Sequence, residues 1–296
     1  MEPNCVGSKM ILPNLILKSR VNKSWKFSGL DHINDCFNKQ HFLSYPHDIS
    51  YEHNSRGFRD QEWPESIQEL ENAIWCVGDS FTVGLGSPIA HTWPSRLCKI
   101  TGRRVINVSM DGASNEWMSR ITENIIQTIR PRHLVIMWSY THRREHKDFS
   151  LNDEQRRNQV VTDSAADWEN FLACKEKIDS LDDSSVQFLV PDFHYDPEAV
   201  DINACWRAIQ DKDWPPAPKD LEELNSLPDW LLLELDQLHN CLGKIRRRLT
   251  KYVLTSAIQV DRLDLARDGH HFDLITADWV AAQAARCLNL PTNSKS

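Results

Sequence analysis

No apolar stretch in this chain of 296 residues approaches the roughly 18 residues that a membrane-spanning helix needs. The first short apolar run, at 10–12, is broken at once by Pro13. A secretory signal has a charged segment, then a longer apolar run, then a cleavage site of small residues. The sequence shows no such succession. We therefore expect a cytoplasmic protein with no membrane contact.

The sequence also lacks closely spaced metal-ligating cysteines and any excess of positive charge. Its 8 cysteines are scattered with no CxxC pair, which argues against a structural zinc site and favours reduced thiols such as Cys76. The 42 acidic side chains outnumber the 34 basic ones, and this balance argues against general affinity for nucleic acid. No metal, no organic cofactor and no nucleic-acid partner is expected, and the oligomeric state is left open.

What the chain does contain is an alternation of short apolar runs and helical patterns. Such alternation indicates one parallel sheet covered by helices on both faces. The expected strands are 73–77, 104–108, 133–138, 186–191 and 252–260. The expected helices are 92–100, 114–129, 160–179, 231–250 and 276–288.

Composition divides the chain into a core and its attachments. Residues 1–50 show no period and are predicted to form an irregular extension packed on the core domain, 51–291. The acidic, proline-rich stretch 195–228 is interpreted as a surface insertion, and 292–296 as a disordered tail.

The first chemical signal is Gly78-Asp79-Ser80, which directly follows the first apolar run. A serine at the carboxyl end of a buried strand lies where open α/β sheets place their chemistry. By itself the tripeptide fits an ordinary turn equally well, or a helix N-cap made by Asp79 or Ser80.

The second signal lies near the other end of the chain, where Asp268 precedes His271 by three residues. In a turn, that carboxylate can reach the imidazole Nδ1 and fix its tautomer. Serine, histidine and aspartate are the three residue types that make a hydroxyl nucleophilic at neutral pH. His270 is the competing candidate for the base, and a polar surface loop is the competing interpretation of the segment.

Together these segments resemble the SGNH, or GDSL, hydrolase family over roughly residues 51–290. Residues 78–82 (GDSFT) match the family's first block, and Asp268-xx-His271 matches its last. The stretches 54–60 (NSRGFRD), 83–86 (VGLG) and 92–97 (TWPSRL) resemble one branch of the family.

The resemblance implies a flavodoxin-like three-layer α/β/α sandwich with a central parallel sheet of about five strands. It also implies that Ser80 is the nucleophile, His271 the general base and then acid, and Asp268 its orienting partner. The backbone N–H groups of Ser80 and Gly112 would form the oxyanion hole, Gly112 being the glycine of the family's second block.

The third block departs from the family pattern. The family has Gly-x-Asn-Asp after the third strand, and its asparagine is an oxyanion donor, but no asparagine occurs at 137–145. The candidates to replace that donor remain open, and Arg143 could instead hold an anionic substrate or partner. These candidates are Ser139, Thr141, His142, Arg143 and, from the second block, Asn115.

The leading hypothesis is a serine hydrolase that cleaves a carboxylic ester. The substrates common in the family suggest the O-acetyl ester of a carbohydrate as one candidate. One alternative is an O-acyltransferase, in which a sugar hydroxyl replaces water. The other is a non-catalytic binding or structural protein that retains the fold. Sequences with these motifs resemble bacterial and phage-encoded proteins, which makes a virion-associated location the alternative to the cytoplasm.

Overall fold

The computed structural model describes residues 15–27, 49–157, 164–191, 193, 256–268 and 270–292. The predicted insertion at 195–228 and the predicted helix at 231–250 lie outside the described residues. Within the described part, no helix has the length and apolar character needed to cross a membrane.

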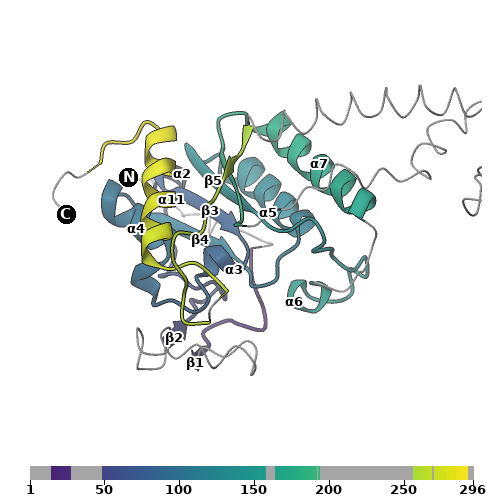
Figure 1. The fold of residues 1–296 in the computed structure, drawn as a ribbon, viewed down its shortest axis with the longest axis horizontal. Coiled ribbons are helices and arrows are strands. Elements are labelled where there is room, and N and C mark those ends of the chain that lie inside the picture. Colours follow the sequence, from purple (N-terminus) through teal and green to yellow (C-terminus); the bar gives the residue numbers. More distant parts are fainter. Residues whose placement is uncertain are drawn as a thin grey trace, which may run out of the picture.

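Five parallel strands form the central sheet, in the order β4-β3-β5-β6-β7 (Figure 1). Numbered along the chain within this sheet, the order is 2-1-3-4-5, which is the flavodoxin-like arrangement. The predicted fold class is therefore confirmed. The strands are β3 (Ile74–Gly78), β4 (Val105–Ser109), β5 (His133–Trp138), β6 (Val186–Leu189) and β7 (Ile258–Gln259).

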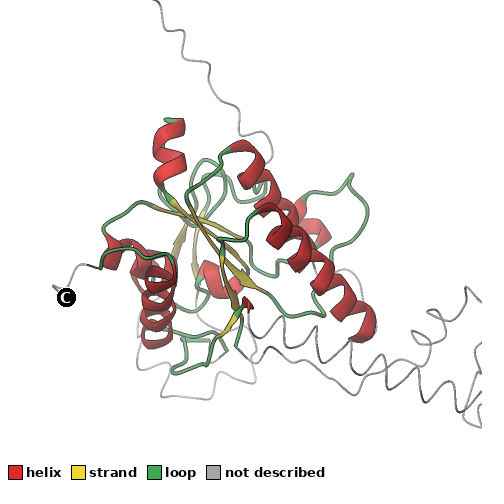
Figure 2. Ribbon diagram, turned by 90° about the horizontal axis from the view of Figure 1, so that it is seen from above, coloured by secondary structure: helices red, strands yellow, loops and turns green. Residues whose placement is uncertain are grey.

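Helices cover both faces of this sheet, as Figure 2 shows from above. One face packs against α4 (Trp93–Thr101) and α11 (Leu274–Cys287), and the other against α5 (Asn115–Thr128) and α7 (Ser164–Leu181). The shorter helical elements are α2 (Ile67–Asn72), α3 (Ser80–Val83), the 3-10 helix η1 (Ile89–His91) and α6 (Asp153–Arg156).

Alternating side chains of each strand supply the two cores. In β3, Ile74 and Cys76 belong to the core beneath α4 and α11, whereas Trp75 and Val77 belong to the core beneath α5 and α7. Successive strand residues point to opposite faces, so a strand covered on both sides must be apolar throughout. All five residues of β3 are buried, which explains its uninterrupted apolar run.

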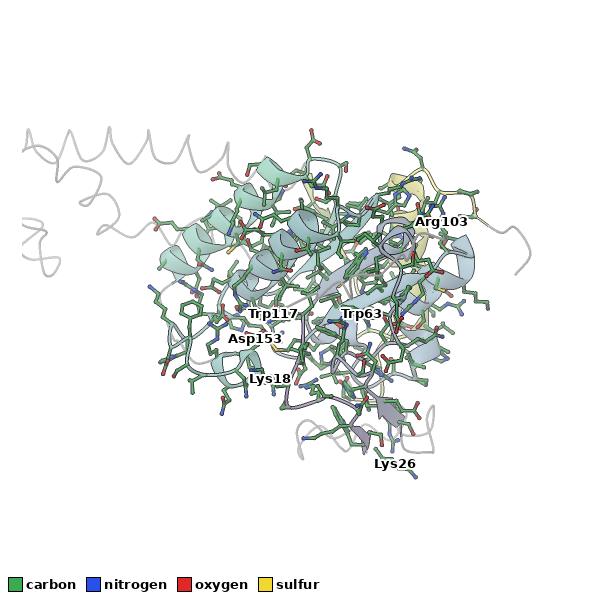
Figure 3. The ribbon with its side chains drawn as sticks, turned by 180° about the vertical axis from the view of Figure 1, so that it is seen from behind. Lys18, Lys26, Trp63, Arg103, Trp117 and Asp153 are labelled. Atoms are coloured by element: carbon green, nitrogen blue, oxygen red, sulfur yellow. The ribbon has the colours of Figure 1, made fainter. Side chains whose placement is uncertain are left out.

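Local signals in the sequence set the helix ends. Thr92 and Ser114 cap α4 and α5, each accepting a hydrogen bond from a backbone N–H in the first helical turn. Gly102 ends α4 in the left-handed region, at φ 66°. Figure 3 shows Trp117 of α5 beside Asp153 of α6. The indole Nε1 of Trp117 donates a hydrogen bond of 3.0 Å to the carboxylate of Asp153.

The described part of the N-terminal segment packs on the domain and contains regular structure. Leu15 and Leu17 are buried in the core beneath α5 and α7. β1 (Ser24–Phe27) pairs antiparallel with β2 (Ile49–Glu52) to form a separate two-stranded sheet. His53, just after β2, is buried, and its ring stacks on Trp25 with centroids 4.2 Å apart.

Acid should destabilise this N-terminal sheet through His53. Burial, aided by the charge of Arg20, lowers the pKa of His53 from 6.5 to about 4. Between pH 6.5 and 4, His53 therefore binds a proton in the unfolded chain but not in the folded one. The free energy of unfolding falls over this range by up to about 3 kcal/mol. Urea unfolding of the wild type and of His53→Phe across this range measures the effect.

His53→Phe keeps a ring against Trp25 but cannot titrate, so its unfolding free energy should fall less steeply with acid. The matched control is His146→Phe, which changes an exposed histidine and should retain the wild-type slope. An unchanged slope in His53→Phe would contradict the assignment.

Candidate functional site

The candidate nucleophile lies where the strand order of the sheet reverses. Ser80 follows β3, and β3 lies between β4 and β5, whose C-terminal loops flank it on either side. Crevices at such switch points are where open α/β sheets bind ligands. Gly78 makes the turn possible, because a Cβ there would lie 2.1 Å from Thr82 Oγ1.

The side chain of Asp79 holds in place the turn at 78–80 that carries Ser80, called here the nucleophile turn. This side chain is fully buried and caps α3, with Oδ1 accepting from the N–H of Phe81 over 3.0 Å. Its Oδ2 accepts from the hydroxyl of Ser139 over 2.6 Å and from Nη1 of Arg143 over 2.7 Å. One carboxylate therefore joins the turn after β3 to the loop after β5.

Asp268 and His271 form a buried hydrogen-bonded pair. Asp268 Oδ2 accepts from His271 Nδ1 over 2.6 Å, and Oδ1 accepts from the backbone N–H groups of His270 and His271, each over 2.9 Å. Burial alone would raise the pKa of Asp268, but the hydrogen bonds and charge of His271 and its neighbour outweigh it and lower that pKa. The carboxylate therefore stays ionised, and Nδ1 carries the proton.

His270 does not take the position of the base. It is exposed, and only its backbone N–H reaches Asp268. Burial of part of its ring, followed by the charges of His271 and Arg262, lowers its pKa. His271 is 4% exposed, and its ring packs against Phe81 with centroids 4.6 Å apart.

Two buried polar atoms near this contact have no hydrogen-bond partner among the described residues. They are the Oγ of Ser80, whose residue is 1% exposed, and the Nε2 of His271. They are not hydrogen bonded to each other either, and catalytic hydrogen bonds are often long in the absence of substrate. Nine other buried side-chain atoms also lack a hydrogen-bond partner within the described residues, so it is the pairing of a serine hydroxyl with an imidazole nitrogen that makes these two a candidate site.

A buried arginine organises the loop that follows the nucleophile. Arg59 donates to the carbonyl oxygens of Val83, Gly84 and Ser87, over 3.0, 2.7 and 2.9 Å. Its guanidinium carbon lies 3.9 Å from the ring centroid of Tyr51. Burial lowers the pKa of Arg59 to about 10, which still leaves it charged at neutral pH.

This loop also contacts the acid of the candidate triad. The N–H of Gly86 donates to the hydroxyl of Tyr51 over 2.8 Å, and its carbonyl accepts from the N–H of Arg267 over 3.1 Å. A Cβ on Gly86 would lie 2.9 Å from Cγ of Asp268. Residues far apart in the sequence, from β2 to the segment before α11, therefore meet around Ser80.

Two backbone donors are available for an oxyanion. The N–H groups of Ser80 and Gly112 make no hydrogen bond within the described residues. Gly112 follows β4 with φ at 70°, in the region that favours glycine.

The side chains proposed for the third donor differ in their availability. Asn115 gives its amide hydrogens to the carbonyl oxygens of Ser139 and Tyr140, and Ser139 gives its hydroxyl hydrogen to Asp79. Neither is free to donate to a substrate. Thr141 is half-buried and makes no hydrogen bond within the described residues, and His142 is exposed with its ring stacked on Tyr140. Arg143 is anchored beside the turn that carries Ser80.

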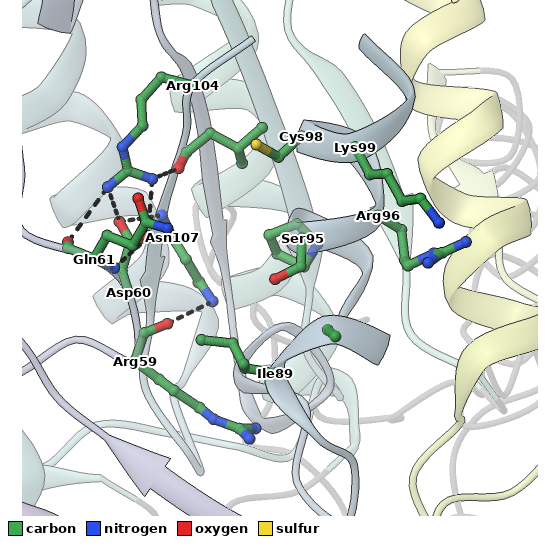
Figure 4. A pocket seen from close by; sticks show the side chains of 13 residues that line it. Arg59, Asp60, Gln61, Ile89, Ser95, Arg96, Cys98, Lys99, Arg104 and Asn107 are labelled. Atoms are coloured by element: carbon green, nitrogen blue, oxygen red, sulfur yellow. Dashed lines mark hydrogen bonds and ion pairs between the residues drawn. The ribbon is translucent and has the colours of Figure 1, made fainter. Parts of the chain in front are cut away.

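A separate pocket of about 420 Å³ lies on the outer side of β4, between the loop at 59–61 and α4. Figure 4 shows Arg104 and Asp60 at its wall, joined by an ion pair of 2.8 Å. Neither Ser80 nor His271 lines it, but Arg59, which supports the loop after Ser80, does.

The sequence prediction missed the residues that hold the site together. Asp79 was named there as one of two candidate N-caps, which the structure confirms, but its bonds to Ser139 and Arg143 were not foreseen. Arg59 and Tyr51 were assigned no contact with the loop after Ser80. The signal for Arg59 was its place in the block at 54–60. Among the described residues, no group of three histidine, cysteine or acidic side chains could hold a metal, and Cys76, Cys98, Cys174 and Cys287 are free thiols.

Gly86→Ala should disturb the Asp268–His271 pair. A residue with a Cβ at φ 74° costs roughly 1–2 kcal/mol, and here the Cβ also meets Asp268. The matched control is Gly102→Ala, which carries similar backbone strain at the end of α4. Urea unfolding should show a loss in both variants, the larger one in Gly86→Ala because its Cβ also lies 2.9 Å from Ala266 Cβ and Asp268 Cγ. Proton NMR should show a shifted or faster-exchanging Nδ1–H of His271 only in Gly86→Ala, and an unshifted signal would contradict the coupling.

Comparisons with known proteins find similarity among solved structures only. No protein-family model matches the sequence, and a search of curated proteins finds no match. Among solved structures, the chain is similar to a lipolytic protein of the G-D-S-L family from Veillonella parvula, at 15% identity and a TM-score of 0.36, covering 72% of this chain and 96% of that one.

It is also similar to a G-D-S-L family protein from Desulfitobacterium hafniense, described as a lipolytic protein, at 12% identity and a TM-score of 0.36, covering 73% and 99% of the two chains. A carbohydrate esterase family 2 enzyme from Corynascus thermopiles (Myceliophthora fergusii) matches at 14% identity and a TM-score of 0.38, covering 74% and 67%. In its strand order and its sequence blocks, the chain resembles the SGNH, or GDSL, hydrolases.

Proposed function

We propose that the protein is a serine hydrolase that cleaves a carboxylic ester, with Ser80 as nucleophile, His271 as base and Asp268 as its orienting partner. The observation that carries this proposal is the buried Asp268–His271 pair with a free Nε2, together with the unpartnered hydroxyl of Ser80. A weak hydroxyl nucleophile needs such a base within the same buried site.

In the first half of the reaction, Ser80 Oγ attacks the ester carbonyl carbon and transfers its proton to His271 Nε2. The carbonyl π electrons move to the oxygen, which becomes an oxyanion. When this intermediate collapses, the alcohol leaves with the proton from His271, and the acyl group stays on Ser80. In the second half, water attacks the acyl carbon on Ser80 while His271 takes its proton. The acyl–oxygen bond to Ser80 then breaks, His271 returns the proton to Ser80, and the carboxylic acid is released.

The role of Asp268 is electrostatic and orienting. Because its carboxylate accepts the Nδ1 proton of His271, Nε2 carries a lone pair ready for the proton of Ser80. The ionised carboxylate also stabilises the imidazolium that forms during each step. Its lowered pKa favours the charged carboxylate that this role requires.

Charge that develops on the carbonyl oxygen would be met by the N–H groups of Ser80 and Gly112, which have no other partner within the described residues. Preorganised donors of this kind are worth about 3 kcal/mol each in the transition state. A carbohydrate O-acetyl ester as the natural substrate stays a prediction.

Wild-type protein should be labelled by a fluorophosphonate probe and should hydrolyse p-nitrophenyl acetate. Ser80→Ala should abolish labelling, and His271→Ala should lower kcat by about 10³-fold or more, because the pair acts as a unit. His270→Ala is the matched control and should retain most activity. A wild type that is neither labelled nor active would refute the proposal and leave the non-catalytic alternative.

Water should be the acyl acceptor. We expect free acetate to equal the alcohol released and to be unaffected by an added sugar such as a xylo-oligosaccharide. Mass spectrometry of the products measures this balance. Acetylated sugar formed at the expense of acetate would instead assign the chain as an O-acyltransferase.

A further inference from the structure

Arg143 occupies the loop where the family resemblance leads one to expect an oxyanion-binding asparagine. Its Nη1 donates to Asp79 Oδ2 over 2.7 Å and to Ser139 Oγ over 3.2 Å. Its guanidinium carbon lies 5.2 Å from the ring centroid of Tyr140, and that ring packs edge-on against Phe81, the residue after the nucleophile. The side chain is 15% exposed, so a substrate can still reach it.

One edge of this guanidinium is left without a partner. Within the described residues, Nη1 makes both side-chain hydrogen bonds of Arg143, and Nη2 and Nε make none. A guanidinium presents its donors in a rigid planar fork, so fixing one nitrogen also fixes the direction of the others. Asp79, which fixes Nη1, directly precedes Ser80 in the chain.

An independent effect indicates that the charge of Arg143 reaches the other side of the site. Burial is the main cause of the lowered pKa of His270, but the charge of Arg143 also contributes. His270 is the neighbour of His271 and comes from the opposite end of the chain. The charge of Arg143 is the smallest of these contributions, after burial and the charges of His271 and Arg262, and it indicates only that the guanidinium lies near enough to His270 for its charge to be felt there.

We propose that Arg143 is the third oxyanion donor, offering Nη2 or Nε to the carbonyl oxygen of the ester that Ser80 attacks. This inference rests on the proposed function and specifies its electrostatics. As the serine oxygen bonds to the carbonyl carbon, the π electron pair becomes a lone pair on oxygen, next to a fixed positive charge. The pair returns to the carbonyl bond when the alcohol leaves with the proton from His271.

A charged donor favours the transition state more selectively than a neutral amide does. The ground-state ester carbonyl is uncharged, whereas the tetrahedral intermediate carries a full negative charge. The guanidinium should therefore affect kcat much more than KM. Asp79 has a second role here, because it orients the cation and balances its charge before substrate arrives.

Arg143→Ala and Arg143→Lys test the proposal with p-nitrophenyl acetate, after urea unfolding has shown that each variant is folded. Arg143→Lys can keep a cation beside Asp79 but has no second donor edge. Both should lose roughly 10²–10³-fold in kcat with little change in KM. Thr141→Val, which removes the other unengaged candidate on this loop, is the matched control and should stay within about 3-fold of wild type.

Chemical rescue supplies a readout that a merely structural role would not give. Added methylguanidinium should restore part of the kcat of Arg143→Ala but leave Ser80→Ala inactive, and ethylammonium at the same concentration should not restore it. Near-normal kcat in Arg143→Lys, a loss confined to KM, or a folded Arg143→Ala without rescue would each overturn the proposal. Failure of the proposed function itself is distinct, because the wild type would then show neither labelling nor turnover.

Discussion

The candidate site depends on a single buried carboxylate. Asp79 is fully buried and satisfies three donors at once: the N–H of Phe81 in α3, the hydroxyl of Ser139 and the guanidinium of Arg143. A buried charge is tolerated only when its partners are in place, so the turn after β3 and the loop after β5 must form together. The orientation of Ser80 and the position of the loop that faces it thus have a common physical cause.

Arg59 imposes a second constraint, on the other side of Ser80. It is a buried cation whose partners are backbone carbonyl oxygens of the loop at 83–87, and it packs on the ring of Tyr51. Tyr51 in turn accepts the N–H of Gly86, which lies against Asp268. The N-terminal sheet is therefore in contact, through two residues, with the acid of the candidate triad. Rigid support of this kind is what a preorganised site requires.

Much of the fold could be predicted from the sequence, because buried parallel strands have a simple signature. The strand at His133–Trp138 has the predicted bounds, and α5 begins one residue inside its prediction because Ser114 is its cap. β7 is limited to Ile258–Gln259 within the predicted range 252–260, of which 252–255 lie outside the described residues. The antiparallel pairing of β1 with β2 was missed, because β2 alternates buried and exposed residues and Ser24, Trp25 and Lys26 of β1 are exposed, so neither strand forms an apolar run.

The candidate site was less predictable than the fold. Ser80, Asp268 and His271 could be named because their blocks resemble a known family. The choice among the five candidates for the third donor could not be made, because it depends on which of their donors are already engaged. These candidates are Asn115, Ser139, Thr141, His142 and Arg143. The pairing of Arg143 with Asp79 joins loops from two strands, and no local pattern in either loop signals it.

The wide separation of the nucleophile and its base along the chain has a consequence for the newly made protein. Chains emerge from the ribosome N-terminus first, at about 5–20 residues per second, and fold progressively. Ser80, Arg59 and the partners of Asp79 all precede β6, whereas Asp268 and His271 come just before the last helix, α11. On the proposed function, Ser80 therefore has no base until the segment that carries Asp268 and His271 has been made and has docked.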